Sequence, residues 1–196
     1  MSGSFAKADV RCLAFAAPLV SIAGKAAGLH HMTPSARRAY EPGHRPKFMA
    51  VVDETAECSR AVRFAARRAA RIGSGVLLVA VVTPPEFTQW IGVGEVMEAE
   101  ALALAERQLE AGAAIVRAVA GLEPEKLIRT GRKADEILKL IDEDEDIAIL
   151  ILAAGTETEG PGPLVSTLAG RSAGHFPIPL AIVPGHLGDL EIDALA

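Results

Sequence analysis

Aromatic residues, cysteine and long apolar runs are scarce in this sequence, and each shortage excludes a class of protein. Only 4% of the 196 residues are aromatic although 50% are hydrophobic, so the core must consist of Ala, Val, Ile and Leu. That composition suits a parallel sheet wrapped by helices better than an all-β sandwich. Cys12 and Cys58 lie far apart without metal-ligand spacing, so we expect free thiols in a cytoplasmic protein. No apolar run approaches the ~18 residues of a membrane-spanning helix.

Positive charge is also in deficit. The chain carries 20 Lys and Arg against 25 Asp and Glu, for a net charge of -5, which argues against a nucleic-acid or anionic-membrane partner. In this acidic chain we interpret a row of arginines as the solvated face of a helix. The row comprises Arg60, Arg63, Arg67, Arg68 and Arg71. The run of carboxylates 142–146 has no calcium-loop spacing, so we expect a solvated turn and no metal cluster.

Short apolar runs that alternate with amphipathic stretches predict the architecture. Strands are predicted at residues 48–52, 76–82, 126–129, 147–154 and 179–183. Helices are predicted at about 58–72, 95–120, 134–141 and 164–176. Five strands that alternate with four helices predict an α/β fold, a doubly wound five-stranded parallel sheet with helices on both faces.

Residues 1–46 differ in character from the rest of the chain. They are rich in Ala, Ser, Gly and Pro and show no periodicity, so we interpret them as a disordered or mis-started extension, with Met1 or Met32 as the translation start. The apolar stretch 13–23 leaves a signal or targeting segment as the alternative. Asp9 and Pro18 count against that alternative.

A Gly/Pro-rich loop follows the strand 147–154 and carries the candidate site. In open α/β sheets ligands bind at the carboxyl ends of the strands, and a glycine loop before a helix can present N–H groups to phosphate. The candidate phosphate-binding residues are Gly155, Thr156, Gly160, Gly162, Ser166 and Thr167. Two prolines and two glutamates in the loop oppose anion binding, and neither a Walker sequence nor GxGxxG is present.

Five segments taken in order resemble the universal stress protein family. They are MAVVDET at 49–55, LLVAVV at 77–82, GRKADEIL at 131–138, ILILAAG at 149–155 and FPIPLAIV at 176–183. The resemblance covers Lys47 to Gly185 and leaves 186–196 as a C-terminal tail. It implies a sheet of order 3-2-1-4-5, an adenine nucleotide alpha-hydrolase-like fold, and a homodimer that pairs the last strands, from Pro179 to Val183.

Members of this family either bind ATP or do not. In the binders an aspartate after the first strand and a valine in the second hold the nucleoside, and the matching residues are Asp53 and Val81. Asp53 is also explained as a carboxylate beside a helix N-terminus. The binders' phosphate loop, G-x2-G-x9-G-[ST], fits only in part. Two alignments of this motif are open. In the first, Gly160 and Gly170 keep the nine-residue gap, but the first glycine and the final hydroxyl residue of the motif are replaced. In the second, Ser166 and Thr167 stand at the final Gly-Ser of the motif.

These observations predict an adenine-nucleotide-binding stress or regulatory protein that holds ATP or AMP and is not an enzyme, or at most a very slow ATPase. The alternative is a dimeric stress protein that binds no nucleotide and acts through protein partners, with the loop around Trp90 as a first surface to test. A third hypothesis, an ATP pyrophosphatase or adenylyltransferase, needs an SGGxDS-type loop or a HxGH pair. The first strand ends instead in Asp53-Glu54-Thr55, and no catalytic triad is apparent in the sequence.

Overall fold

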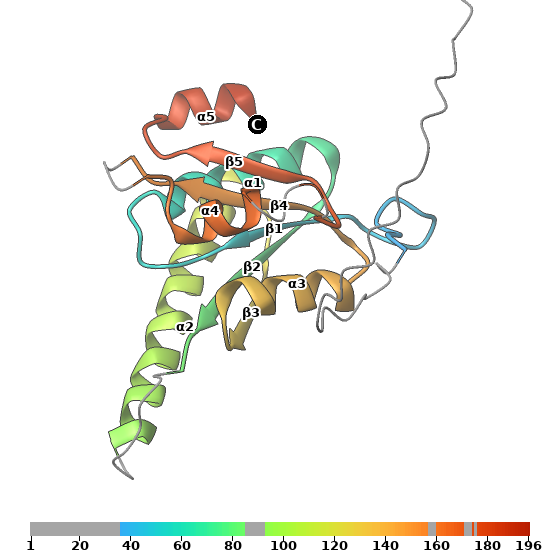
Figure 1. The fold of residues 1–196 in the computed structure, drawn as a ribbon. Helices are drawn as coiled ribbons and strands as arrows, with labels where there is room; N and C mark the ends of the chain where they lie inside the picture. Colours follow the sequence, from blue (N-terminus) through green and yellow to red (C-terminus); the bar gives the residue numbers. More distant parts are fainter. Residues whose placement is uncertain (1–35, 85–92, 157–159, 171–173, 175) are drawn as a thin grey trace, which may run out of the picture. The chain divides into compact units, whose positions relative to one another are not determined.

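Five parallel strands form one sheet. The computed structural model describes residues 36–84, 93–156, 160–170, 174 and 176–196, which all belong to one unit, Pro34–Ala196. The strands are β1 (Lys47–Val51), β2 (Gly75–Val82), β3 (Glu125–Thr130), β4 (Ile147–Ala154) and β5 (Leu180–Pro184). Their order is β3-β2-β1-β4-β5 and every neighbouring pair is parallel (Figure 1). The predicted fold class and the strand order that the resemblance implied are confirmed.

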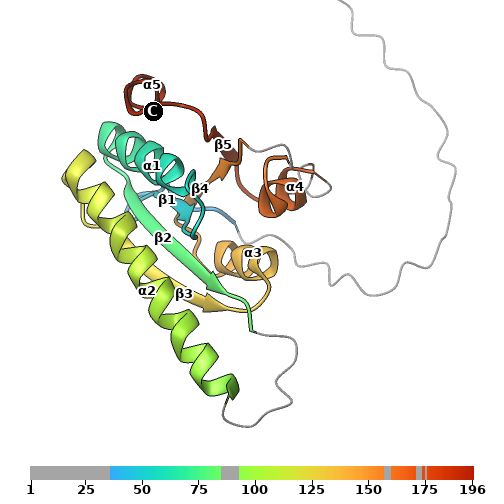
Figure 2. The ribbon, with the colours of Figure 1, turned by 90° about the vertical axis from the view of Figure 1, so that its left-hand side faces the viewer.

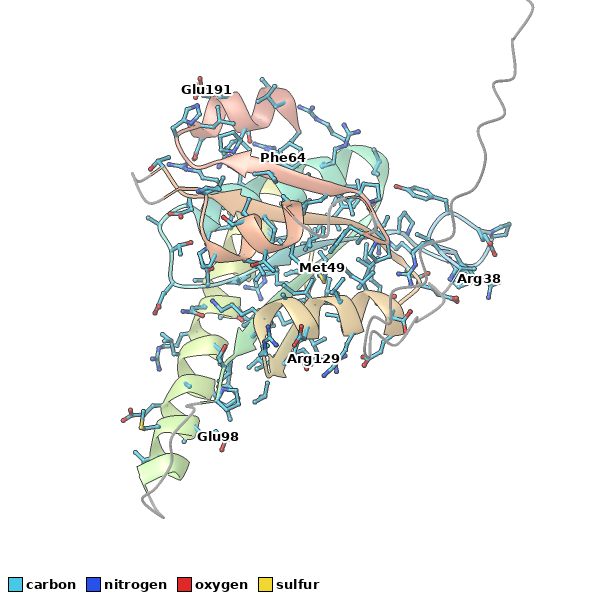
Figure 3. All side chains as sticks on the ribbon, in the orientation of Figure 1. Arg38, Met49, Phe64, Glu98, Arg129 and Glu191 are labelled. Atoms are coloured by element: carbon cyan, nitrogen blue, oxygen red, sulfur yellow. The ribbon has the colours of Figure 1, made fainter. Side chains whose placement is uncertain are left out.

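Helices cover both faces of this sheet. They are α1 (Cys58–Ile72), α2 (Val93–Ala120), α3 (Lys133–Glu143), α4 (Pro163–Ala169) and α5 (Asp189–Leu195). α1 and α2 lie on one face, and α3 and α4 lie on the other (Figure 2). Side-chain alternation along β1 explains the division, because Phe48 and Ala50 pack with α1 and α2 while Met49 and Val51 pack with α3 and α4. Met49 accordingly lies in the interior (Figure 3).

The fourth predicted helix is shorter than the sequence pattern indicated. α4 ends at Ala169 and not near Phe176, because Gly170 leaves the helical conformation with φ -85° and ψ -102°. A Cβ atom at Gly170 would lie 2.4 Å from the carbonyl oxygen of Ser166, so a residue with a side chain does not fit this backbone. Phe176 nevertheless packs on the same cluster as Val165. The apolar residues of this segment therefore share one hydrophobic core, but they do not belong to one continuous helix.

The acidic run 142–146 binds the segment that precedes β1. The Nδ1 atom of His44 lies 2.6 Å from Oδ1 of Asp146, and Lys47 Nζ lies 3.0 Å from Oδ2 of Asp144. Less than a quarter of each of these four side chains is exposed. The interpretation of the run as a solvated turn was therefore wrong for Asp144 and Asp146, because these two carboxylates bind His44 and the first residue of β1.

Most of the arginine row on α1 contacts α5, which lies beside α1 at the end of the chain (Figures 1 and 2). Arg60 donates to Asp189 at 2.6 Å, and Arg63 and Arg67 both donate to the carboxylate of Asp193 at 2.7–2.9 Å. The interpretation of this row as a solvated face was therefore wrong for these three arginines, whereas Arg68 is exposed. α5 lies within the residues that the sequence analysis assigned to a C-terminal tail.

Candidate functional site

The candidate site lies at the carboxyl edge of the sheet, where β1 and β4 are neighbours. The chain runs from β1 outward through β2 to β3, and then returns to place β4 and β5 on the other side of β1. The connections after β1 and β4 therefore leave in opposite directions and open a crevice between them, which is the position where doubly wound sheets bind ligands. A cavity of about 320 Å³ occupies this crevice. Its apolar lining includes Val51, Leu152 and Val165.

Asp53 follows β1 at the rim of this cavity. Its Oδ1 atom accepts hydrogen bonds from the backbone N–H of Thr55 at 3.0 Å and from the Thr55 hydroxyl at 2.6 Å. This local turn orients the carboxylate. The alternative explanation, a carboxylate stabilised by the dipole of α1, remains open, although the N-cap position itself belongs to Glu57. Asp53 is half-buried, and within the part of the chain that the structure describes only its Oδ1 atom accepts hydrogen bonds.

A second, smaller hollow of about 160 Å³ lies on the other side of Asp53. Val81, the second predicted nucleoside residue, lines this hollow together with Thr83 and Gln108. Asp53 and Lys133 line both the cavity and this hollow. The structure therefore brings Asp53 and Val81 together, as the resemblance implied, and adds a lysine that the site prediction had not named.

The glycine loop between β4 and α4 lines a third hollow of about 540 Å³ with Gly155, Gly160, Gly162 and Ser166. Gly160 and Gly162 have φ of +98° and +93°, which residues with side chains rarely adopt. The N–H of Gly155 donates to the carbonyl of Pro161 at 3.4 Å, so the loop closes on itself.

Two of the predicted hydroxyl residues lie outside that third hollow. Thr167 lines the cavity, but its hydroxyl donates to the carbonyl of Pro163 at 2.8 Å within α4. Thr156 is exposed and lines none of the three hollows; its Cγ2 atom lies 3.3 Å from where a Cβ of Gly185 would stand. Several other residues of the sequence argument lie outside the described residues, namely Cys12, Met32, Trp90, Glu157, Glu159 and Arg171.

Most of the residues that line the cavity were missed as site residues, among them two cations and a thiol. Arg132 and Lys133 form the turn between β3 and α3, and both side chains are exposed. Cys58 begins α1 on the cavity wall, and burial raises the pKa of its thiol to about 11. The sequence did contain a signal for the two cations, because Arg132 and Lys133 directly follow the end of a predicted strand. They lie in the segment GRKADEIL, which served only to support the family resemblance.

Neither a metal-binding cluster nor a membrane-spanning helix is found among the described residues. Within them, no group of three or more His, Cys, Asp or Glu side chains is placed to hold a metal ion. None of the described helices is long and apolar enough to cross a bilayer. The cavity instead combines an apolar floor with one oriented carboxylate, hydroxyls and two cationic side chains.

The strand order and the cavity define a doubly wound α/β protein with a cavity at the switch point of its sheet. The sequence model of the universal stress protein family matches residues 44–184, and the chain belongs to that family. None of the curated protein sequences compared with the chain matches it.

Solved structures with the same fold share little sequence with this chain. The universal stress protein UspA from Lactobacillus plantarum is 16% identical with a TM-score of 0.59, and the match covers 76% of this chain and 99% of that one. The universal stress protein from Archaeoglobus fulgidus in complex with dAMP is 20% identical with a TM-score of 0.52, over 71% and 98%. A universal stress protein in complex with cAMP is 16% identical with a TM-score of 0.53, over 70% and 96%.

Proposed function

We propose that this protein binds an adenine nucleotide, ATP or AMP, in the cavity between β1 and β4 and acts as a nucleotide-binding stress or regulatory protein. The observation that carries the proposal is the position of Asp53, whose oriented carboxylate lies between the cavity and the hollow that reaches Val81. The volume of the cavity between β1 and β4, about 320 Å³, lies at the lower end of the range for small-molecule sites. The dAMP and cAMP complexes of universal stress proteins with the same fold support the choice of ligand.

The nucleoside has a defined place in this proposal. The base packs on the apolar floor of the cavity, and the ribose hydroxyls donate to Asp53. The backbone at Val81 recognises the edge of the base. The phosphate has two candidate positions, the hollow along the glycine loop and the turn before α3.

Binding without efficient catalysis is part of the proposal, with at most a very slow ATPase activity. No histidine is among the described residues that line the cavity, and burial favours the protonated form of the Cys58 thiol. The described lining therefore offers neither a histidine base nor a reactive thiolate. We further propose that residues 47–185 form the nucleotide-binding domain of a cytoplasmic protein, that 1–46 is an extension before it, and that the tail 186–196 packs on it through α5.

The second candidate function is a dimeric stress protein that acts through protein partners without nucleotide. It is favoured by the glycine loop, in which Pro161 and Pro163 lack N–H groups and the Gly155 amide is already bonded. We propose in both cases a homodimer that pairs residues 179–183, because β5 is an edge strand whose Ile182 is 41% exposed.

The test is to denature freshly purified protein, identify released nucleotides by mass spectrometry, and titrate ATP, AMP and adenosine by calorimetry. Asp53→Ala should weaken nucleotide binding about 10- to 100-fold, the effect of losing a hydrogen bond to a charged group, with a melting temperature within a few degrees. The matched control is Glu98→Gln, which removes an exposed carboxylate from the far end of α2 (Figure 3).

Two results would contradict the proposal in different ways. Equal affinity of the Asp53→Ala variant and the wild type would remove Asp53 from the site. Absence of released nucleotide together with absence of heat at millimolar ligand would favour the partner-binding function.

A further inference from the structure

The hollow beside Val81 lies where β1 has ended and β2 continues. Val52 donates its N–H to the carbonyl of Val79, and the register between β1 and β2 ends at the pair of Val51 and Val79. Residues two positions apart along a parallel strand face the same neighbour, so Val81 turns its N–H and C=O groups toward space that β1 no longer fills. A donor and an acceptor side by side match the N1 and N6 atoms of adenine, and the proposed function places the edge of the base here.

Gln108 enters this hollow from α2, the helix that lies against β2 and β3. Asp53 and Gln108 are half-buried there, whereas the other polar side chains of the described lining, Glu54, Thr83 and Lys133, are exposed. Gln108 has no hydrogen bond with any residue that the structure describes. A half-buried amide without a protein partner gains free energy from a ligand that offers it both a donor and an acceptor.

The residues around Gln108 leave room for a planar ring. Ala101 and Ala105 line the hollow with side chains of one carbon, and Leu104 adds an apolar contact. Leu104 and Ala105 lie four and three positions before Gln108, so all three occupy one flank of α2. A base held at Val81 therefore meets an apolar surface from which an amide group projects.

The chemistry of this amide matches the edge of adenine that Val81 leaves free. That edge carries the second N6 hydrogen and the N7 acceptor. The C=O of a glutamine accepts from N6 while its NH2 donates to N7, which is the bidentate pairing by which glutamine recognises adenine. Guanine presents two acceptors on the same edge, O6 and N7, and leaves the amide oxygen without a donor.

We infer that Gln108 on α2 is a specificity-determining residue of the nucleotide site, and that its amide binds the N6 and N7 atoms of adenine. This inference rests on the proposed function and deepens it. The base keeps its place on the floor of the cavity with its edge in the hollow beside Val81, and a side chain of α2 joins the backbone of β2 in selecting adenine.

The experiment titrates AMP and 7-deaza-AMP, in which a C–H group replaces N7, into the full chain and three variants by calorimetry. Gln108→Met keeps the length of the side chain without the amide, Gln108→Glu keeps an acceptor without the donor, and Glu106→Gln changes an exposed side chain of α2 outside the three hollows. We expect the wild type to bind AMP about 10-fold more tightly than 7-deaza-AMP, the effect of one hydrogen bond. That preference should persist in Glu106→Gln, disappear in Gln108→Met, and reverse in Gln108→Glu, whose carboxylate repels the lone pair of N7.

The two ligands are compared within each variant, so a general loss of stability does not imitate the expected result. Equal affinities of the wild type for AMP and 7-deaza-AMP overturn the contact with N7. The same preference for AMP in Gln108→Met and in the wild type overturns the assignment of Gln108. Failure of the wild type to bind either ligand at millimolar concentration overturns the proposed function itself.

Discussion

Replacement of Ile192 by alanine tests whether the C-terminal helix is an integral part of the domain. Ile192 has 0% of its surface exposed although α5 is the last helix of the chain. The substitution removes three side-chain carbons, each worth about 0.8 kcal/mol of transfer free energy, which gives about 2.4 kcal/mol before any cavity cost. Buried Ile→Ala changes cost about 2 to 5 kcal/mol. We expect about 2 to 3 kcal/mol, because a short terminal helix can settle into the vacated space.

Urea unfolding followed by circular dichroism measures this loss of stability, and a thermal melt should move down by about 4 to 12 °C for a domain of this size. The matched control is Leu190→Ala, since Leu190 lies on the same helix with 85% of its surface exposed. Its expected cost is within about 0.5 kcal/mol. Equal stabilities of the two variants would refute the packing of α5 on α1.

Two further predictions concern titratable groups. The guanidinium groups of Arg63 and Arg67 hold the pKa of the Asp193 carboxyl well below its usual range. Because the folded-state pKa is depressed, this pairing stabilises the fold above the unfolded pKa of about 4 and is lost as pH falls below it. Asp193→Asn should flatten the acid side of the stability profile measured by urea unfolding from pH 3 to 7, and an unchanged slope would contradict the pairing. Burial raises the pKa of Cys58 to about 11, so in a Cys12→Ser background a thiol reagent at pH 8 should label Cys58 only after denaturant is added. Fast labelling of the native protein would show that the thiol is accessible.

The strands and helices were predictable because each one leaves a pattern of apolar residues within its own short segment of sequence. The apolar run 147–154 coincides with β4, and the helix predicted at about 95–120 coincides with α2, whose buried face includes Leu109 and Val116. A buried strand and an amphipathic helix each leave a periodic pattern in the sequence. The order of the strands came only from the family resemblance, because pairing across the sheet leaves no such pattern.

The charged pairings were not predictable for the opposite reason. Arg63 and Asp193 are separated by 130 positions, and His44 and Asp146 by 102. The sequence does not show whether a charged side chain is solvated or paired with a residue far away in the chain. At the candidate site the same limit applied to Lys133, since its position beside Asp53 depends on the adjacency of β1 and β2 to the β3–α3 turn.

The attachment of α5 to α1 has a consequence for protein synthesis. The arginines of α1 are translated first, and their partner Asp193 follows up to 130 residues later. At roughly 5 to 20 residues per second, α1 waits about 6 to 26 s for that partner. During this interval the arginines of α1 lack the carboxylate that binds them in the folded domain. This side of α1 is therefore completed late in synthesis, after the strands that pack beneath it have been made.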